Sequence, residues 1–296
     1  MAEPLVHLFD GHVYIFRAWV TLPDMPAPDG THTGAAYGFA NTLLRYLADE
    51  SPEYAACCFD YAMKSFRNDV FPAYKSSRGD DVPPDLAPQF DLARDVSWGV
   101  GLSAHERPDY EADDILGTMV DQLLAEGARV RIITADKDLA QLVTEDGRVS
   151  LYDLQRDTHM DADGVREKFG VNPDQIPDYL ALVGDNIDDL PGVPGYGKKS
   201  AAVALGAFGN LEGIPDDPAG WEGVEVRGAK RLAANMAEHR EQALQIRELA
   251  TVVRTVPGIE ARLSGLEWHG ADRERFPDLC DRLGWGRIAT RPSRWA

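Results

Sequence analysis

Three features are scarce in this sequence of 296 residues, and each scarcity excludes a class of protein. Only three cysteines occur, an odd and sparse set that argues against a disulfide-stapled fold. No apolar run approaches the ~20 residues that span a bilayer, and the first residues lack the basic and apolar regions of a secretory signal. These absences predict a soluble, cytoplasmic protein with reduced cysteines and no membrane partner.

Positive charge is also in short supply. The chain has 30 Lys and Arg residues against 49 Asp and Glu residues, which gives a net charge of −19 and a pI near 4.7. Proteins that bind nucleic acid usually carry a basic surface. An acidic chain can still bind nucleic acid if its carboxylates gather around divalent metal ions and its basic residues are local. The positions of the charges therefore matter more than their sum.

The first two thirds of the sequence alternate short apolar runs with helical patterns, which is typical of a mainly parallel α/β sheet. Strands are predicted at 5–9, 54–59, 102–106, 129–134 and 149–152, and helices at 33–47, 84–100, 111–125 and 138–143. Beyond about residue 161 helices dominate, at 163–169, 173–182, 198–208, 229–253 and 273–283. We therefore expect an α/β core with an α-helical module packed on it.

Carboxylates follow the predicted strands where those strands end. They are Asp10, Asp60, Asp136 and Asp138 after three strands, and Glu111, Asp113 and Asp114 at the start of a helix after another. The carboxyl ends of parallel strands share one edge, so these acids can converge there. Any single one could be only a turn or cap residue. Seven together would repel one another unless divalent metal ions neutralised them.

The chemistry of this acidic set indicates the metal. Ligands that are all carboxylates, with no His or Cys beside them, favour Mg²⁺ or Mn²⁺ over zinc. Two such ions ~4 Å apart can stabilise the attacking and leaving oxygens of a phosphoryl transfer. A further pair, Asp185 and Asp188, is spaced to share one side of a helix end.

The segment GVPGYGKKSA follows that pair and nearly matches a phosphate-binding P-loop. However, Lys199 stands where Ser or Thr is required, and a helix rather than a strand precedes the glycines. We interpret it instead as a hairpin between two helices. Its glycines would let backbone amides approach a DNA phosphate, in front of a positive helix N-terminus.

A local basic segment, KSFRNDVFPAYKSSR, lies just after Asp60. Basic and aromatic residues alternate in it, as in surfaces that bind unpaired nucleic acid. The alternative is an amphipathic helix with a solvated basic face, and the position next to an acidic strand end favours a functional role. The residues concerned are Lys64, Arg67, Lys75 and Arg78, with Phe66, Phe71 and Tyr74 between them.

Together, six stretches resemble the structure-specific 5′ nuclease family: flap endonucleases, phage 5′ exonucleases and the 5′-nuclease domain of bacterial DNA polymerase I. They follow the family's order and cover roughly residues 5–255. EADD, then TADKDL, then GDxxDxLPGVxGxGxK is the most specific combination. The stretches are FDGHVYIFRAW, AAYGFANTLLRYL, CFDYAMKSFRNDVFPAYKSSR, DYEADDILG, ITADKDLAQL and LVGDNIDDLPGVPGYGKKSAAVAL.

The resemblance implies a PIN-like fold, in which helices flank a mainly parallel central sheet. It also implies a helical arch over about 66–100 and a helix-three-turn-helix module. The expected divisions are a nuclease core at 1–165, the DNA-binding module at 166–256 and a C-terminal extension at 257–296 that packs on the core.

The resemblance also assigns roles to individual residues. One metal ion would be held by Asp10, Asp60, Glu111 and Asp113, and a second by Asp136, Asp138, Asp185 and Asp188. Lys75 and Arg78 would contact the scissile phosphate, and Asp114 would share the acidic catalytic site. The expected DNA contacts are Arg17, Lys64, Arg67, Tyr74, Gly195, Gly197, Lys198, Lys199 and Ser200, and a potassium ion is expected in the helix-three-turn-helix motif.

The implied function is a 5′→3′ exonuclease and 5′-flap endonuclease that uses two divalent metal ions. Its expected substrates are DNA with 5′ ends, flaps or nicks, and RNA primers, and we expect a monomer. Because the sequence ends at Ala296 without a polymerase domain, we expect a stand-alone nuclease, and the alternative is an excised domain of a longer protein. The alternatives are a PIN-type ribonuclease and a DNA-structure-binding protein without activity. Two departures from the family pattern, Ile187 and Asp189, lie beside the second set of ligands.

Overall fold

In the computed structural model, which describes residues 3–78 and 82–296, six strands form one sheet in the order β3-β2-β1-β4-β5-β6. Neighbouring strands from β3 to β5 are parallel and β6 is antiparallel, so all five predicted strands are confirmed. The sixth was not predicted, because it is only three residues long. The strands are β1 (Leu5–Asp10), β2 (Tyr54–Cys58), β3 (Ser103–His105), β4 (Arg129–Ile133), β5 (Val149–Asp153) and β6 (Thr158–Met160).

The register of the sheet brings the strand ends to one level. Asp10 at the end of β1 pairs with Cys58 of β2, and Phe9 pairs with Ile133 of β4. Residues that follow these three strands therefore emerge at the same edge, as the sequence predicts.

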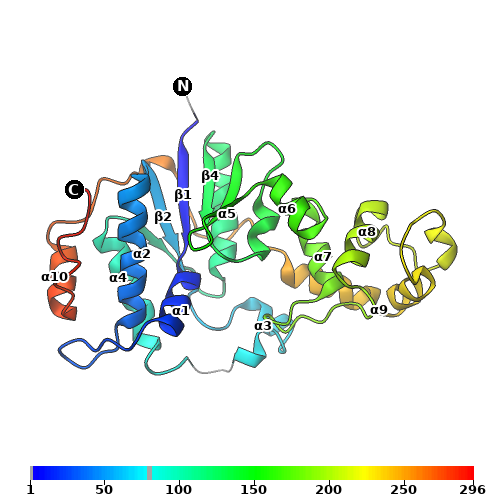
Figure 1. Cartoon of the computed structure of the whole chain (residues 1–296), viewed down its shortest axis with the longest axis horizontal. Coiled ribbons are helices and arrows are strands. Elements are labelled where there is room, and N and C mark those ends of the chain that lie inside the picture. The colour runs from blue at the N-terminus through cyan, green and yellow to red at the C-terminus, as the bar shows by residue number, and fades with distance from the viewer. Residues whose placement is uncertain (1–2, 79–81) are drawn as a thin grey trace.

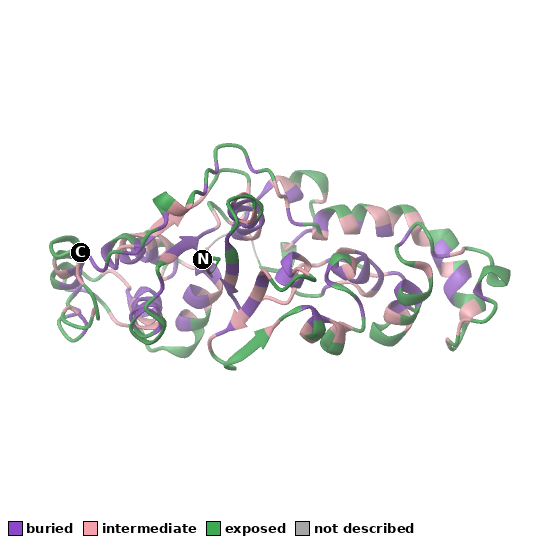
Figure 2. Cartoon of the chain, turned by 90° about the horizontal axis from the view of Figure 1, so that it is seen from above, coloured by how far each residue is buried: buried purple, intermediate pink, exposed green. Residues whose placement is uncertain are grey.

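Helices cover both faces of the sheet (Figure 1). One apolar cluster, which includes Phe9 and Phe39, joins the sheet to the helices α1 (Gly11–Thr21), α2 (Gly34–Glu50), α4 (Ala87–Gly99) and α10 (Arg275–Leu283). On the other face α5 (Ala112–Ala125) packs against Val6 and Leu8. Figure 2 shows the resulting buried residues along the sheet and the inner sides of the helices. Helix α1 was not predicted, because most of its residues are apolar and show no clear period.

Helices α6, α7, α8 and α9 lie on the β5–β6 side of the sheet and form the other half of the molecule (Figure 1). The predicted helix at 138–143 is a 3₁₀ helix, and the long helix ends at Ala250 rather than at residue 253. The elements are η2 (Asp138–Leu142), α6 (Ala162–Phe169), η3 (Pro173–Gln175), α7 (Ile176–Val183), α8 (Lys198–Phe208), η4 (Pro218–Trp221), α9 (Ala229–Ala250) and η5 (Leu263–Gly265).

The basic segment is not one amphipathic helix. It contains the short helix α3 (Phe66–Val70) and the 3₁₀ helix η1 (Ser76–Arg78). The expected arch at about 66–100 comprises these two elements and α4, and its residues 79–81 lie outside the described part of the chain. None of the helices in the described residues has the length and apolar composition needed to cross a membrane.

Candidate active site

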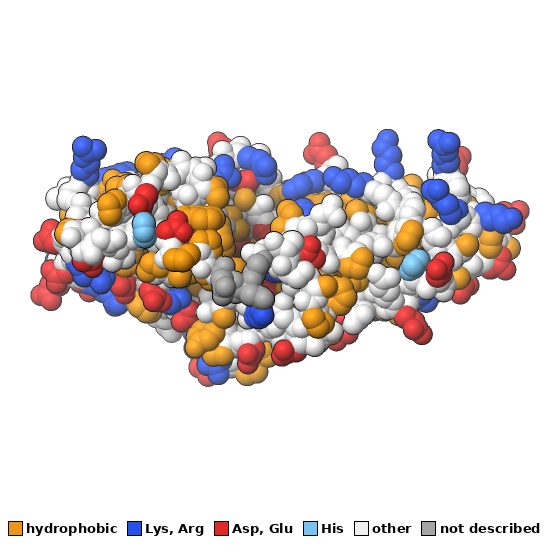
Figure 3. Space-filling model, turned by 90° about the horizontal axis from the view of Figure 1, so that it is seen from below, with side chains coloured by type: hydrophobic (Ala, Val, Ile, Leu, Met, Phe, Trp, Pro, Cys, Tyr) orange, Lys and Arg blue, Asp and Glu red, His pale blue; other side chains and the backbone are white. Residues whose placement is uncertain are grey.

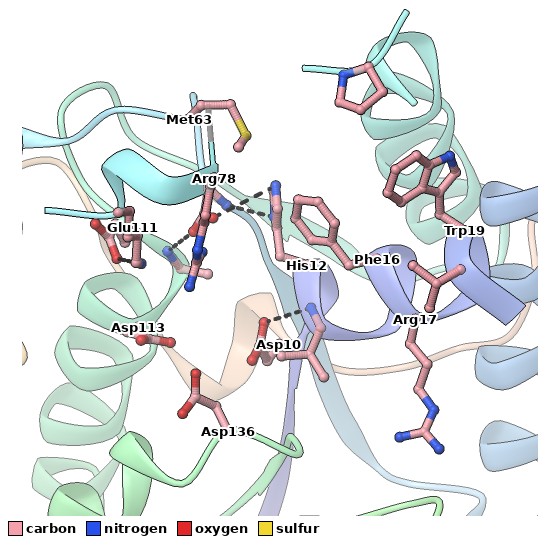
Figure 4. Close-up of a pocket in the computed structure, with 16 residues that line it drawn as sticks. Asp10, His12, Phe16, Arg17, Trp19, Met63, Arg78, Glu111, Asp113 and Asp136 are labelled. Atoms are coloured by element: carbon pink, nitrogen blue, oxygen red, sulfur yellow. Dashed lines mark hydrogen bonds and ion pairs between the residues drawn. The ribbon is translucent and has the colours of Figure 1, made fainter. Parts of the chain in front are cut away.

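A cleft of about 660 Å³ opens at the carboxyl edge of the sheet. One wall is apolar and comes mainly from α1, through Val13, Phe16, Trp19 and Val20. Acidic residues from the strand ends form the opposite wall, next to Lys75 and Arg78 (Figure 4). Figure 3 looks onto this edge of the molecule: hydrophobic side chains gather near its centre, and Lys and Arg side chains lie along the upper margin of the helical half.

Three acids in the cleft form no ion pair among the described residues: Asp10, Asp113 and Asp136, which we call the unpaired carboxylates. They point toward a shared space in Figure 4. Asp10 ends β1, is 3% exposed, and accepts a hydrogen bond from the Thr134 hydroxyl at 2.8 Å. Burial, together with the charge of Asp136, raises the pKa of Asp10 to about 7. The same two causes raise the pKa of Asp113 well above its usual range.

Two further acids border this group. Burial, followed by the charge of Asp136, raises the pKa of Asp138 to about 8, and Asp138 Oδ1 is buried without a hydrogen-bond partner. Asp60 is held from two sides: its Oδ1 accepts the Ala112 N–H at 2.7 Å, and its own N–H donates to His12 Nδ1 at 3.0 Å.

This arrangement suits a divalent cation. The donors are carboxylate oxygens, the chemistry that hard ions such as Mg²⁺ prefer. The raised pKa values and the unsatisfied Asp138 oxygen show that negative charge is costly here without a cation. Within residues 3–78 and 82–296, however, no three acidic, His or Cys side chains already have the spacing of a metal site. Three of these side chains would have to move closer together to hold one ion.

Three other acids are neutralised by the chain itself: Glu111, Asp185 and Asp188, which we call the paired carboxylates. Lys75 Nζ lies 2.7 Å from Glu111 Oε2 and 3.9 Å from Asp188 Oδ2. Arg78 Nη2 lies 2.6 Å from Asp188 Oδ1, and Lys137 forms an ion pair with Asp185. Burial opposes ionisation of Glu111, but the charges of Lys75 and Arg67 outweigh it, and the pKa of Glu111 falls to about 2.

Asp185 and Asp188 do not share a helix end, contrary to the prediction. Helix α7 ends at Val183, and the next residues form a turn closed by paired backbone hydrogen bonds between Asp185 and Leu190. Within this turn Asp185 faces Lys137 and Asp188 faces the basic segment.

The structure gives Arg67 and Asp114 a role different from the predicted one. Arg67 is 3% exposed and donates two hydrogen bonds of 2.7 Å to the fully buried Asp114. Arg67 Nε also donates to the Leu249 carbonyl at the end of α9, and Asp114 accepts the Val253 N–H. This buried pair ties α3 and α5 to the helical module. We therefore revise both residues from the DNA contact and the catalytic acid to structural roles.

The other predicted residues of the basic segment differ in accessibility. Tyr74 is buried, and its hydroxyl lies 3.2 Å from Glu111 Oε2 and 3.3 Å from Asp188 Oδ2, so its ring is no exposed stacking surface. Lys64 is exposed, and Arg17 is an exposed residue of α1 that lines the cleft (Figure 4).

The predicted hairpin lies between α7 and α8, in the same connection as the turn that carries Asp185 and Asp188. Gly195 has φ +86°, and an added Cβ would lie 3.2 Å from Asn235 Nδ2, so the turn requires glycine there. The Gly197 N–H donates to Ser200 Oγ at 2.9 Å at the start of α8. Lys198 and Lys199 are exposed beside it and line a second cavity of about 600 Å³, together with Arg227.

Four site residues were missed from the sequence: His12, Ser65, Thr134 and Lys137. Ser65 Oγ donates to Glu111 Oε1 at 2.7 Å, and Thr134 supports Asp10 in the same way. Each of the four lies within five residues of a predicted ligand along the chain. That proximity is the only signal in the sequence that could have identified them.

The sequence matches two family models and is similar to known bacterial proteins. Residues 5–170 match the family model "5′-3′ exonuclease, N-terminal resolvase-like domain", and residues 171–274 match "5′-3′ exonuclease, C-terminal SAM fold". DNA polymerase I of Bacillus subtilis is 35% identical over 96% of this chain and 32% of its own length. DNA polymerase I of Pseudomonas aeruginosa is 40% identical over 84% of this chain and 27% of its own. The chain thus spans about a third of these relatives.

Solved structures agree on the fold. T5 5′-exonuclease with bound zinc has a TM-score of 0.67 at 20% identity and covers 84% of this chain and 90% of its own. The catalytic core of Rad2 in complex with DNA has a TM-score of 0.64 at 16% identity, over 96% of this chain and 89% of its own. The fold is therefore the one found in these two nuclease structures. The chain belongs to the 5′-3′ exonuclease family, whose members are enzymes that hydrolyse DNA.

Proposed function

We propose that this chain removes nucleotides from 5′ ends of DNA and cuts 5′ flaps, with two divalent metal ions bound in the acidic cleft. One observation carries the proposal: three unpaired carboxylates share a cleft with Lys75 and Arg78. In such a cleft the carboxylates can bind cations, and the two basic side chains can contact a phosphate that lies between the cations and those side chains. The structures of T5 flap endonuclease with DNA and metal ions and of Rad2 with DNA substrate support the substrate class.

The chain's own residues would act on the substrate in two ways, and the bound ions would make a third contribution. Lys75 and Arg78 exchange their contacts with Glu111 and Asp188 for the scissile phosphate and stabilise its developing negative charge. Lys198 and Lys199, at the N-terminus of α8, hold a duplex phosphate away from the reaction. The bound ions would supply an activated water and neutralise charge in the transition state.

The ligand sets in this proposal are Asp10, Asp60, Glu111 and Asp113 for one ion, and Asp136, Asp138, Asp185 and Asp188 for the other. Contacts from four of these acids to Lys75, Arg78 and Lys137 must break as the ions bind: those of Glu111, Asp138, Asp185 and Asp188. Mg²⁺ is the proposed ion, because all donors are carboxylates.

The proposal includes finer points that rest on the family resemblance. They are a potassium ion held by backbone carbonyls of the hairpin before α8, action on RNA primers as well as DNA, and a monomeric enzyme. The expected division into a core at 1–165, a DNA-binding module at 166–256 and an extension at 257–296 is retained as part of it.

A digestion assay tests the proposal. A 5′-flap duplex, a nicked duplex and a plain single strand, each labelled at one end, are incubated with the protein in Mg²⁺ or in EDTA. We expect cleavage of the flap and nicked substrates in Mg²⁺ only. Full activity in EDTA, or no cleavage of any substrate in Mg²⁺, would contradict it.

A further inference from the structure

The basic segment is tethered to the turn that carries Asp185 and Asp188. The Lys75 N–H donates to the Asp188 carbonyl at 3.0 Å, and the Ser77 N–H donates to Asp189 Oδ2 at 2.7 Å. Arg78 adds its ion pair with the Asp188 side chain. Two backbone amides and one side chain of the segment are thus fixed by two consecutive acids on a turn more than a hundred residues away in the sequence.

The backbone at this junction is strained. Lys75 has φ +54°, a left-handed conformation in which the Cβ of any residue but glycine is crowded. Such a conformation persists only where surrounding contacts hold it, and it is concentrated at functional sites. Asp189 also has φ +54°, but Asp tolerates this region better than most residues. The strain at Lys75 therefore requires the tether.

Asp189 differs from its neighbour in what it touches. Asp188 reaches Lys75, Arg78 and Tyr74 and belongs to a proposed ligand set. The Asp189 carboxylate instead accepts the Ser77 N–H at 2.7 Å and does not line the cleft. It can hold the segment without occupying the cleft.

We propose that Asp189 is a positioning residue: its carboxylate fixes the backbone of η1 and thereby aims Lys75 and Arg78 at the scissile phosphate. The inference rests on the proposed function, in which those two side chains act on the phosphate. A displacement of about 1 Å in a catalytic group can slow a reaction by ~100-fold. Loss of the tether should accordingly reduce the rate of cleavage and leave substrate affinity nearly unchanged.

Two substitutions at Asp189 distinguish the effect of losing the carboxylate from the effect of disturbing the left-handed backbone conformation. Asp189→Gly removes the acceptor, and glycine accepts φ +54° without strain. Asp189→Asn keeps an acceptor oxygen and also tolerates this conformation. We expect the single-turnover rate on a flap substrate to fall at least tenfold in Asp189→Gly and to stay within about threefold in Asp189→Asn. Dissociation constants in Ca²⁺ should stay within about threefold for both.

A matched control and a double variant complete the test. Asp217 also accepts a backbone N–H, from Ala219 within its own loop at 2.9 Å, so Asp217→Gly should leave the rate unchanged. If Asp189 acts through Lys75, Asp189→Gly should slow a Lys75→Ala enzyme much less than it slows the wild type. An unchanged rate in Asp189→Gly, or the full additional loss in the double variant, would overturn the inference.

The outcomes also separate this inference from the proposed function. If Lys75→Ala cleaves at the wild-type rate, the role of Lys75 in the proposed function fails. If Lys75→Ala is slow and Asp189→Gly is not, only the positioning role of Asp189 fails. Thermal unfolding of each variant in the absence of DNA shows whether it is folded.

Discussion

The unpaired and the paired carboxylates lie in the same acidic site but balance their charge differently. Asp10 is buried and Asp113 is partly buried, and desolvation together with the charge of Asp136 raises the pKa values of both. Glu111, by contrast, ionises readily, because Lys75 and Arg67 outweigh the cost of its burial. The comparison shows that basic side chains of the protein neutralise one half of the site, the paired carboxylates. The other half, the unpaired carboxylates, has no such partner and is open to metal ions from solution. It also explains how so acidic a protein tolerates this cluster.

The largest effect should follow from removing an unpaired carboxylate. Asp10→Ala or Asp136→Ala should lower the rate of flap cleavage by at least ~1,000-fold, because each would remove a direct ligand of a catalytic ion. DNA affinity in Ca²⁺ should remain close to that of the wild type. Single-turnover kinetics and a binding titration measure the two quantities. A substitution that weakens binding as much as cleavage would show that these acids contribute to the fold and not to catalysis.

The next effect concerns the cations of the paired half. Lys75→Ala should reduce the single-turnover rate by ~100-fold with only a small change in DNA affinity. The reason is that the Lys75 ammonium group would stabilise negative charge that develops on the phosphate during the reaction. Arg262, an exposed side chain, serves as the control, and Arg262→Ala should behave as the wild type. Equal rates for the two variants would mean that Lys75 only neutralises Glu111.

Stability of the metal-free protein should depend on pH in a direction set by the unpaired half. The pKa of Asp10 is about 7 in the folded protein against an ordinary value of 3.8, so the folded state holds its proton longer. Stability should then fall as pH rises from about 4 to about 7, by ~1.4 kcal/mol per pKa unit at most. Asp138, with a pKa of about 8, extends this fall upward.

The paired half should act in the opposite direction and over another range. The pKa of Glu111 is about 2 against 4.5, so its contribution is complete above pH 4.5 and is lost as pH falls toward 2.

Thermal unfolding in EDTA between pH 5 and 8 tests the raised pKa values. Because Glu111 contributes fully over this range, the unfolding midpoint should drop by several degrees as the pH rises, and by less in Asp10→Asn. Added Mg²⁺ should restore it at pH 8. A midpoint that rises with pH in EDTA would contradict the raised pKa values.

The smallest effect lies outside both halves. Lys198→Ala with Lys199→Ala should weaken duplex binding about equally for all sequences and flatten the slope of log affinity against log salt by roughly one to two units. The metal requirement should not change, because Lys198 and Lys199 line the second cavity and not the acidic cleft. A salt titration in Ca²⁺ measures the slope. An unaltered slope would place the duplex contact elsewhere.

The sequence predicted the sheet well because its strands are apolar and its acids follow them directly. It predicted Arg67 poorly, since a basic residue between aromatic ones looks the same whether it faces DNA or a buried acid. The role of Arg67 is determined by hydrogen bonds to residues far away in the sequence, namely to Asp114 and to the Leu249 carbonyl. Asp185 and Asp188 were misplaced for a related reason: Gly184 ends α7, and the turn closes by backbone pairing that side-chain spacing does not reveal.

Calorimetric titration of Mn²⁺ into metal-free protein tests the central claim most directly, namely that divalent ions bind in the cleft where the chain supplies no cation of its own. The ligand set that includes Asp10 should therefore fill before the set that includes Asp185. Wild type, Asp10→Asn and Asp185→Asn are compared at pH 7. Our account predicts that Asp10→Asn loses the tightest binding event, whereas Asp185→Asn, which removes an acid already neutralised by Lys137, retains it. Retention of that event in Asp10→Asn and its loss in Asp185→Asn would contradict the account.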